Sequence, residues 1–211
     1  MGLAVSVGIT SEPADADEEE AAERRDELDR LSAALAAEGV HWGEPEGAPV
    51  PPMRSAVISF PYSCLHHLRR VLALVDAGRP VPPVDGPAAL DQDKNVVKAK
   101  TMTFSSHLLC HSDCEGYYVP VDFPEPLFLP EDEVAGGGMV GSSQGLLAEL
   151  RRCAPALGVR LEPDGSLSDG EAARLSELPE DADFATETMV WLTLHEACLA
   201  SIVSGYAIVF E

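Results

Sequence analysis

Hydrophobic residues recur along the first part of the chain with spacings that predict one strand and one helix. Residues 3–9 are rich in β-forming side chains and are bounded by Gly and Ser, which predicts a buried first strand. Residues 17–37 place Leu28, Leu31 and Leu35 on one side of a helix whose first turns are acidic. An acidic start favours a helix because the first turn carries partial positive charge.

The next elements are predicted from the same periodicities. Residues 56–60 suggest a short strand, and residues 62–77 suggest a second helix that turns its leucines inward. At 100° per residue, His66 and Arg70 fall on the opposite, polar face of that helix. Three stretches rich in Pro and Gly are expected to be loops: those near residues 42–53, 79–91 and 124–141.

Two further runs of β-forming residues flank a polar segment in the middle of the chain. Residues 101–109 and 117–123 predict a β-hairpin with a six-residue loop, or two strands at separate positions of a sheet. A third helix is expected to start at Ser142 or Ser143, and Gly158 is its expected C-terminal signal.

The last third of the chain predicts a buried helix followed by a strand. Residues 168–178 suggest a short acidic helix. Residues 184–204 are apolar nearly all round, which is typical of a helix at the centre of a core, and residues 206–210 suggest a closing strand. We therefore expect residues 1–211 to form a single α+β domain, with a small mixed sheet, helices packed on it and a buried C-terminal helix.

The charge balance changes the expectations about partners. The 211 residues carry 36 acidic and 14 basic groups, a formal net charge of −22. This balance predicts no nucleic-acid partner and no membrane partner, because both anionic surfaces require clustered Lys and Arg. The excess of carboxylates serves solubility, or it provides a surface that imitates DNA or binds a protein partner with a basic surface.

The charge is also unevenly distributed. Residues 54–100 contain seven basic and four acidic groups, so they form a locally cationic zone on an acidic chain. Such a zone could hold an anionic ligand or neutralise neighbouring acidic helices. The chain has no basic, apolar leader and no run of 18 apolar residues, and its five cysteines are scattered and odd in number. These features predict a cytoplasmic protein with reduced thiols.

The densest group of chemically capable side chains lies between His107 and Tyr118. His111, Asp113, Cys114 and Glu115 are the candidate catalytic residues, and His111 with Asp113 could bind a divalent metal. Their spacing does not match a standard zinc motif. The structural alternative is a polar turn in which Asp113 caps backbone N–H groups and a following glycine adopts a positive φ.

Three smaller groups are candidate ligand-binding residues. A glycine-rich run leads into a helix N-terminus at Ser142, Ser143 and Gln144, a geometry that can bind an oxyanion or can simply place a serine cap. His195 and Glu196 lie in the buried helix, where Glu196 must be paired, protonated or exposed to a cavity. The remaining candidates are the cationic His66 and Arg70.

One segment resembles a known group of sequences. The run HSDCEGYYVPVDF, residues 111–123, resembles a segment of uncharacterised bacterial proteins that are associated with toxin–immunity loci. The resemblance assigns no catalytic residue and implies a non-enzymatic immunity or interaction protein. Together with the charge, it makes an acidic intracellular interaction protein the first functional hypothesis. The second is a small-molecule enzyme or binding protein, with a pocket formed by residues 111–115, residues 136–144 and the His195–Glu196 pair.

Overall fold

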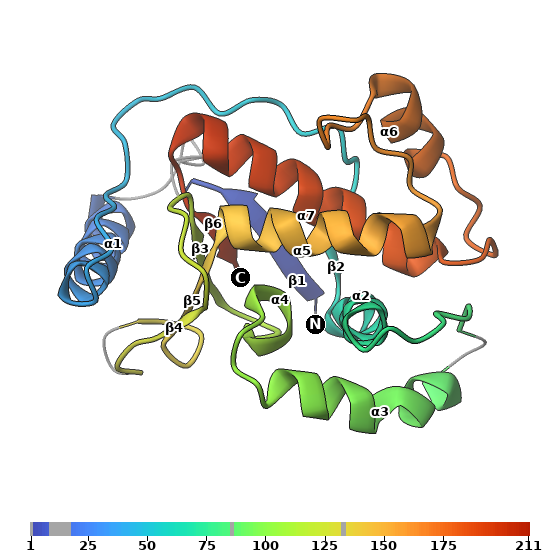
Figure 1. The fold of residues 1–211 in the computed structure, drawn as a ribbon. Coiled ribbons are helices and arrows are strands. Elements are labelled where there is room, and N and C mark those ends of the chain that lie inside the picture. Colours follow the sequence, from blue (N-terminus) through green and yellow to red (C-terminus); the bar gives the residue numbers. More distant parts are fainter. Residues whose placement is uncertain (1, 9–17, 85–86, 132–133) are drawn as a thin grey trace.

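A computed structural model describes residues 2–8, 18–84, 87–131 and 134–211, and it contains a mixed β-sheet with helices on both faces (Figure 1). The six strands follow the order β2-β1-β6-β3-β5-β4. Only β3 and β5 run parallel; the other neighbouring pairs are antiparallel. The strands are β1 (Gly2–Val7), β2 (Ser59–Pro61), β3 (Gly116–Val119), β4 (Leu127–Phe128), β5 (Met139–Ser142) and β6 (Ile208–Phe210). The mixed α+β fold expected from the sequence is confirmed.

Alternation along the strands divides the interior into two layers. Tyr118 of β3 joins the larger core, whereas its neighbours Tyr117 and Val119 join the smaller one. Ile208 and Val209 of β6 separate in the same way. Successive strand side chains point to opposite faces of a sheet, so each strand contributes to both layers.

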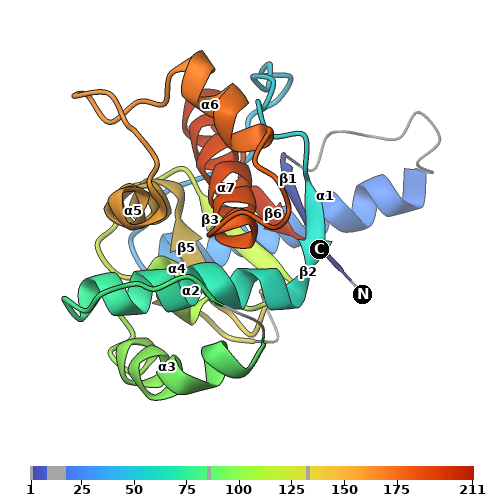
Figure 2. The same cartoon turned by 90° about the vertical axis from the view of Figure 1, so that its right-hand side faces the viewer.

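The helices cover the two faces unequally. Helix α1 (Glu18–Ala37) packs its leucines on the smaller core, whereas α2 (Tyr62–Asp76), α5 (Ser143–Cys153) and α7 (Ala185–Ser204) build the larger core (Figures 1 and 2). Helix α7 lies between α2, α5 and α6 (Asp169–Ser176) and contacts β1 and β6 as well. Most of its apolar residues are therefore buried, as its sequence predicts, but Val203 near its C-terminal end is 73% exposed.

The region between α2 and β3 differs from the sequence prediction. A third helix, α3 (Pro87–Thr101), begins inside the stretch expected to be a loop, and Pro87 is its first residue. Proline fits the first helical position because that N–H has no intrahelical partner. The expected strand over residues 101–109 is absent; the end of α3 is followed by a turn and the short α4 (His107–Cys110). The hairpin prediction was wrong.

The expected loop near residues 124–141 was also only partly correct, because it contains β4 and β5. Strand β5 pairs with β3 in parallel, with Tyr118 opposite Gly141. A side chain at Gly141 would lie 2.2 Å from the Tyr118 ring, so this position requires glycine for the two strands to pair. A short strand within a glycine-rich run lacks the apolar alternation on which sequence prediction depends.

Several boundaries agree with the sequence. Ser142 caps α5 by accepting a hydrogen bond from the Gly145 N–H at 3.0 Å, and Ser168 caps α6. Gly158 and Gly205 end their helical segments with φ of 67° and 85°. Within the part of the chain that the structure describes, no helix is both long and apolar enough to span a membrane.

Candidate functional site

The polar segment between His107 and Tyr118 is built around a buried imidazole. The His111 ring stacks on Tyr118 with centroids 4.2 Å apart, and it is 3% exposed. Its Nδ1 lies 3.1 Å from the Ser112 carbonyl oxygen and its Nε2 lies 3.2 Å from that of Tyr117. Burial lowers the pKa of His111 to about 4, so the ring is neutral near pH 7. The His111 ring therefore holds the polar turn of residues 111–116 against strand β3.

Asp113 contacts two side chains of α2. It forms an ion pair with Arg69, and one of its oxygens lies 3.2 Å from His66 Nε2. The His66 contact, opposed by partial burial and helped by Arg69, lowers the pKa of Asp113 to about 2. Arg69 also donates to the carbonyl oxygen of Leu108 at 2.9 Å. Asp113 therefore fastens the turn to α2 through side-chain contacts.

The expectation that Arg70 faces solvent was wrong. Arg70 is 2% exposed, and it donates to Asp93 at 2.8 Å and to the Pro82 carbonyl at 3.0 Å. The cause is α3, which packs against α2 and covers the face that the helical wheel marks as polar (Figure 2). Helix α2 was predicted correctly, but α3 was not, and the presence of α3 buries the face of α2 that was expected to be exposed.

The other two candidate catalytic residues, Cys114 and Glu115, are exposed. They border a hollow of about 390 Å³ whose further lining includes Glu27 of α1 and Glu211. Among the described residues, no group of three or more His, Cys, Asp or Glu side chains is arranged to hold a metal ion. The catalytic and metal-binding roles of residues 111–115 stay predictions.

The residues at the start of α5 are joined to their neighbours. Ser142 donates its backbone N–H to His107 Nδ1 at 3.1 Å, and the Ser143 hydroxyl lies 2.8 Å from that of Ser201. Gln144 donates to the Pro120 carbonyl at 3.1 Å. These contacts explain the polar residues as connections between elements, and their ligand-binding role stays a prediction.

Glu196 is paired, which is one of the outcomes expected for a carboxylate in a buried helix. Arg54 donates from Nη2 to Glu196 Oε1 at 2.7 Å and from Nε to Oε2 at 2.9 Å. Burial alone would raise the pKa of Glu196, but bonds from His195 and Arg54 outweigh it and lower the pKa to about 2. The His195 ring stacks on Trp191 at 4.6 Å. Neither His195 nor Glu196 is among the described residues that line the hollow beside Cys114 and Glu115.

A set of exposed carboxylates near the C-terminal end was not among the residues singled out in the sequence. Residues 162–183 hold eight acidic residues and one arginine. Six of the eight are exposed and, among the described residues, form no ion pair. We call these the C-terminal acidic surface: Glu162, Asp164, Glu177, Glu180, Asp181 and Asp183.

The arginines near this surface are bound by carboxylates that point inward. Glu171 is 4% exposed and binds Arg160 at 2.7 Å and Arg174 at 2.5 Å. The Arg174 contact is the main reason that the pKa of Glu171 falls to about 2. Arg54 is held in turn by Glu196 and Asp169. Arg54, Arg160 and Arg174 are therefore already paired, whereas Arg151 donates to the Gly165 carbonyl at 3.1 Å and forms no ion pair with a described residue.

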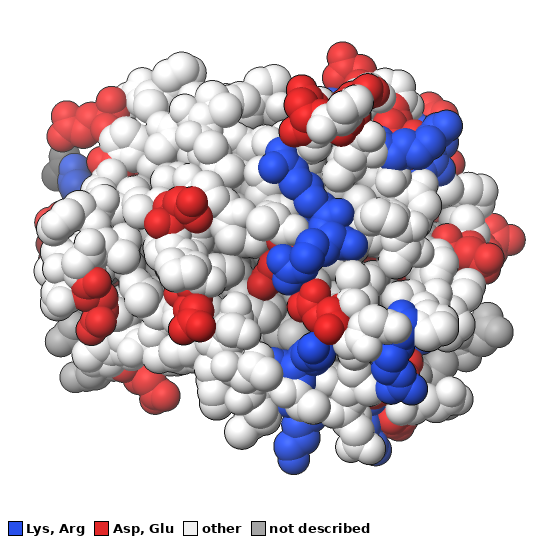
Figure 3. All heavy atoms as spheres, in the orientation of Figure 1, with Lys and Arg blue, Asp and Glu red and all other residues white. Residues whose placement is uncertain are grey.

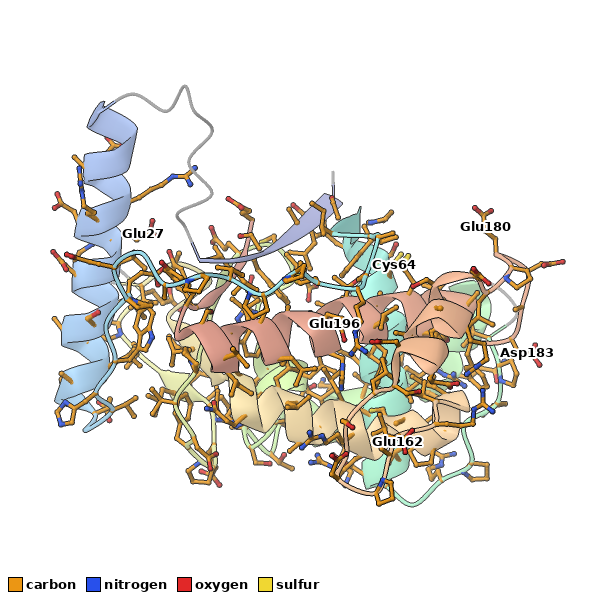
Figure 4. All side chains as sticks on the ribbon, turned by 90° about the horizontal axis from the view of Figure 1, so that it is seen from above. Glu27, Cys64, Glu162, Glu180, Asp183 and Glu196 are labelled. Carbon is orange, nitrogen blue, oxygen red and sulfur yellow. The ribbon has the colours of Figure 1, made fainter. Side chains whose placement is uncertain are left out.

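A second acidic region lies on α1, which contains seven acidic and three basic residues. Within residues 22–30, whose side chains the structure describes, four are acidic and three are basic. Figure 4 shows Glu27 at one end of the molecule, Glu180 and Asp183 at the other, and Glu162 in the same half as Glu180 but on the opposite side of the view. In Figure 3, Asp and Glu side chains gather over α6 at the upper right, while Lys and Arg occupy the centre of this face. The chain therefore has two acidic regions, and in the C-terminal one the exposed carboxylates form no ion pair with a described residue.

Comparison with known proteins supplies a family. A family model described as "Putative DNA-mimic protein" matches residues 1–210. No curated protein and no solved structure matches the chain. The sequence predicted a protein partner with a basic surface and no nucleic-acid partner, and the match corrects this expectation. A DNA mimic takes the place of nucleic acid, so the relevant class of partner is proteins that bind DNA.

Proposed function

We propose that this chain, which belongs to the "Putative DNA-mimic protein" family, is a DNA mimic. Its C-terminal acidic surface would occupy the DNA-binding site of a DNA-binding protein. The chain is an acidic interaction protein, and this proposal assigns the interaction to one region. The observation that carries the assignment is the pairing of Arg160 and Arg174 with buried Glu171, which leaves the neighbouring exposed carboxylates without an ion pair to a described residue.

The physical basis is the way proteins recognise the DNA backbone. Each DNA strand carries one negative charge about every 3.4 Å along the helix axis, and Lys and Arg bind these charges with release of counterions. Six exposed carboxylates within residues 162–183 offer fixed negative charge to the same cations. Because they are attached to a folded scaffold, they need no base pairing to keep their positions.

The narrower role suggested by the sequence is a form of the same proposal. In an immunity-type role, the partner would be a toxin whose DNA-binding surface is covered. Such a partner requires a cytoplasmic location, which agrees with the five free cysteines. The resemblance of residues 111–123 to proteins of toxin–immunity loci supports this form.

The test uses the full chain immobilised on a resin and exposed to a bacterial extract. We expect retained proteins to be released by a short DNA duplex and not by salt of the same ionic strength. The DNA affinity of each released protein is then measured by fluorescence anisotropy, with the chain as competitor. Proteins that the duplex cannot release would contradict the proposal.

Two variants with equal charge change identify the surface. The first carries Glu177→Gln, Glu180→Gln, Asp181→Asn and Asp183→Asn; the matched control carries Glu23→Gln, Asp26→Asn, Asp29→Asn and Glu38→Gln. We expect the first to compete at least about tenfold more weakly and the control to change by less than about threefold, since charge near the contact acts within a Debye length. Equal losses would show that net charge alone matters.

A further inference from the structure

A concave surface lies between α2 and α3, on the basic part of the chain. The two helices pack against each other and cross, since Figure 1 shows α2 nearly along its axis and α3 lengthwise (Figures 1 and 2). The groove has a volume of about 470 Å³, and Leu90 and Val97 of α3 contribute apolar surface to it. Pockets for small ligands have volumes of about 300–1,000 Å³, with a mainly apolar lining and a few polar groups. The size and lining of this groove therefore fit a small molecule.

Cations surround this apolar surface. Arg69 and Arg70 form its inner wall and are each less than a tenth exposed, while Lys94 and Lys98 stand at its exposed side. Arg69 is paired with Asp113 and Arg70 with Asp93.

The two lysines are the groups available to a ligand. Lys94 lies 3.5 Å from Asp91, but both side chains are more than two-thirds exposed, and such a pair is weak. The Lys98 ammonium forms no ion pair or side-chain hydrogen bond with a described residue. Four permanent cations thus face three carboxylates, Asp91, Asp93 and Asp113. The groove keeps one positive charge in excess on a chain of net charge −22.

We propose that the groove between α2 and α3 binds a small anionic amphiphile, in which a carboxylate or phosphate group is attached to an apolar body. The apolar part would lie on Leu90 and Val97, and the anionic group would be bound by Lys94 and Lys98. An anion is favoured over a cation because the groove is positive where the rest of the chain is acidic. This site is independent of the C-terminal acidic surface, since the two share no residue.

The test is a two-dimensional NMR titration of the full ¹⁵N-labelled chain with octyl phosphate and with octanoate. Inorganic phosphate and octanol serve as half-ligands that lack the apolar or the charged part. We expect saturable shifts of the amides of α2 and α3, and binding at least about tenfold tighter than that of either half-ligand, because both parts contribute. Saturation by only one amphiphile would support the site and identify its anionic group.

Three variants decide whether the groove itself binds the probe. Lys94→Gln with Lys98→Gln should weaken binding about five- to tenfold, because it removes two cations at the ligand. Val97→Thr, which keeps the side-chain volume, should also weaken it. Lys100→Gln is the matched control, because its ammonium donates to the Asp76 carbonyl at 2.8 Å. Equal affinity of the double variant and the control would overturn the proposal. Octanol binding as tightly as the anions, shifts confined to other elements, or no saturable shift would also overturn it.

Discussion

The Arg54 guanidinium donates two hydrogen bonds to the Glu196 carboxylate, from Nη2 at 2.7 Å and from Nε at 2.9 Å. This pair joins segments that are 142 residues apart. Arg54 belongs to the connection between α1 and β2, and Glu196 lies in the middle of α7. The same side chain donates to the Leu167 carbonyl at 2.8 Å and to Asp169 at 3.0 Å. One arginine therefore holds both the connection and the start of α6 against α7.

The first prediction concerns this pair. Glu196→Gln removes the negative charge and leaves a guanidinium that is only about a third exposed without its main partner. We expect a loss of about 2–4 kcal/mol in the free energy of unfolding, measured by urea denaturation. Asp169→Asn is the control, because Asp169 is 97% exposed and its contact with Arg54 should contribute less than about 1 kcal/mol. Similar losses in both variants would contradict this account.

The second prediction is a loss of stability in mild acid. Burial lowers the pKa of His107 and His111 from 6.5 to about 4, so the folded state favours their neutral forms. Their contribution is complete above the unfolded pKa and is lost as pH falls from 6.5 to about 4. The loss should reach roughly 3 kcal/mol per histidine.

Carboxylates should affect stability only at lower pH. Asp113, Glu171 and Glu196 have pKa values of about 2, so their contributions disappear below the unfolded carboxyl pKa near 4. Urea denaturation at a series of pH values separates the two ranges. In a His111→Gln variant the decline between pH 6.5 and 4 should be shallower. An unaltered decline in His111→Gln would be incompatible with this assignment.

The third prediction is that Gly145→Ala destabilises the protein, although alanine is the better helix former. A Cβ at Gly145 would lie 2.2 Å from the His107 ring, and that ring is held by the Ser142 N–H at 3.1 Å. The clash should cost about 1–3 kcal/mol. Gly170→Ala in α6 is the control, because its Cβ would meet no atom within 4 Å, and it should gain up to about 1 kcal/mol. Thermal unfolding should show a lower melting temperature for Gly145→Ala and an unchanged or higher one for Gly170→Ala.

The fourth prediction separates folding from recognition at the C-terminal acidic surface. The four substitutions at Glu177, Glu180, Asp181 and Asp183 remove carboxylates that form no ion pair with a described residue. Because mutual repulsion is reduced, stability at low salt should stay the same or rise by about 0.5–1 kcal/mol. The gain should shrink in about 0.5 M NaCl, where the charges are screened. A large loss of stability would mean that these residues serve the fold.

The fifth prediction concerns thiol reactivity. Cys114 is exposed, while Cys153 and Cys198 are buried and their pKa values are raised, mainly by burial. A thiol reagent should label Cys114 rapidly in the native protein, and Cys153 and Cys198 only after unfolding. Mass spectrometry of a timed reaction identifies the order. Early labelling of Cys153 would indicate that α5 opens locally.

Much of the fold could be predicted from the sequence, since the signals of individual elements are local. The repeated leucines of α1 and α2, the serine caps of α5 and α6, and the apolar α7 each depend on residues within a few positions of one another. Helix α3 was missed because Pro87 and the prolines that precede it in the sequence mask its start, and because its apolar face is weak. The strand pairings also required tertiary information, because β3 finds its partners in β5 and β6 rather than in the preceding segment.

The candidate site shows the same division. The sequence determined the net charge of −22, the acidic composition of residues 162–183 and the polar turn near His111. Only the tertiary structure decided which charges remain available at the surface. Glu171 binds Arg160 and Arg174, and Glu196 binds Arg54, whereas the carboxylates between Glu177 and Asp183 form no ion pair with a described residue. Charge neutralisation depends on distances of a few ångströms between residues far apart in the chain, and composition alone does not contain those distances.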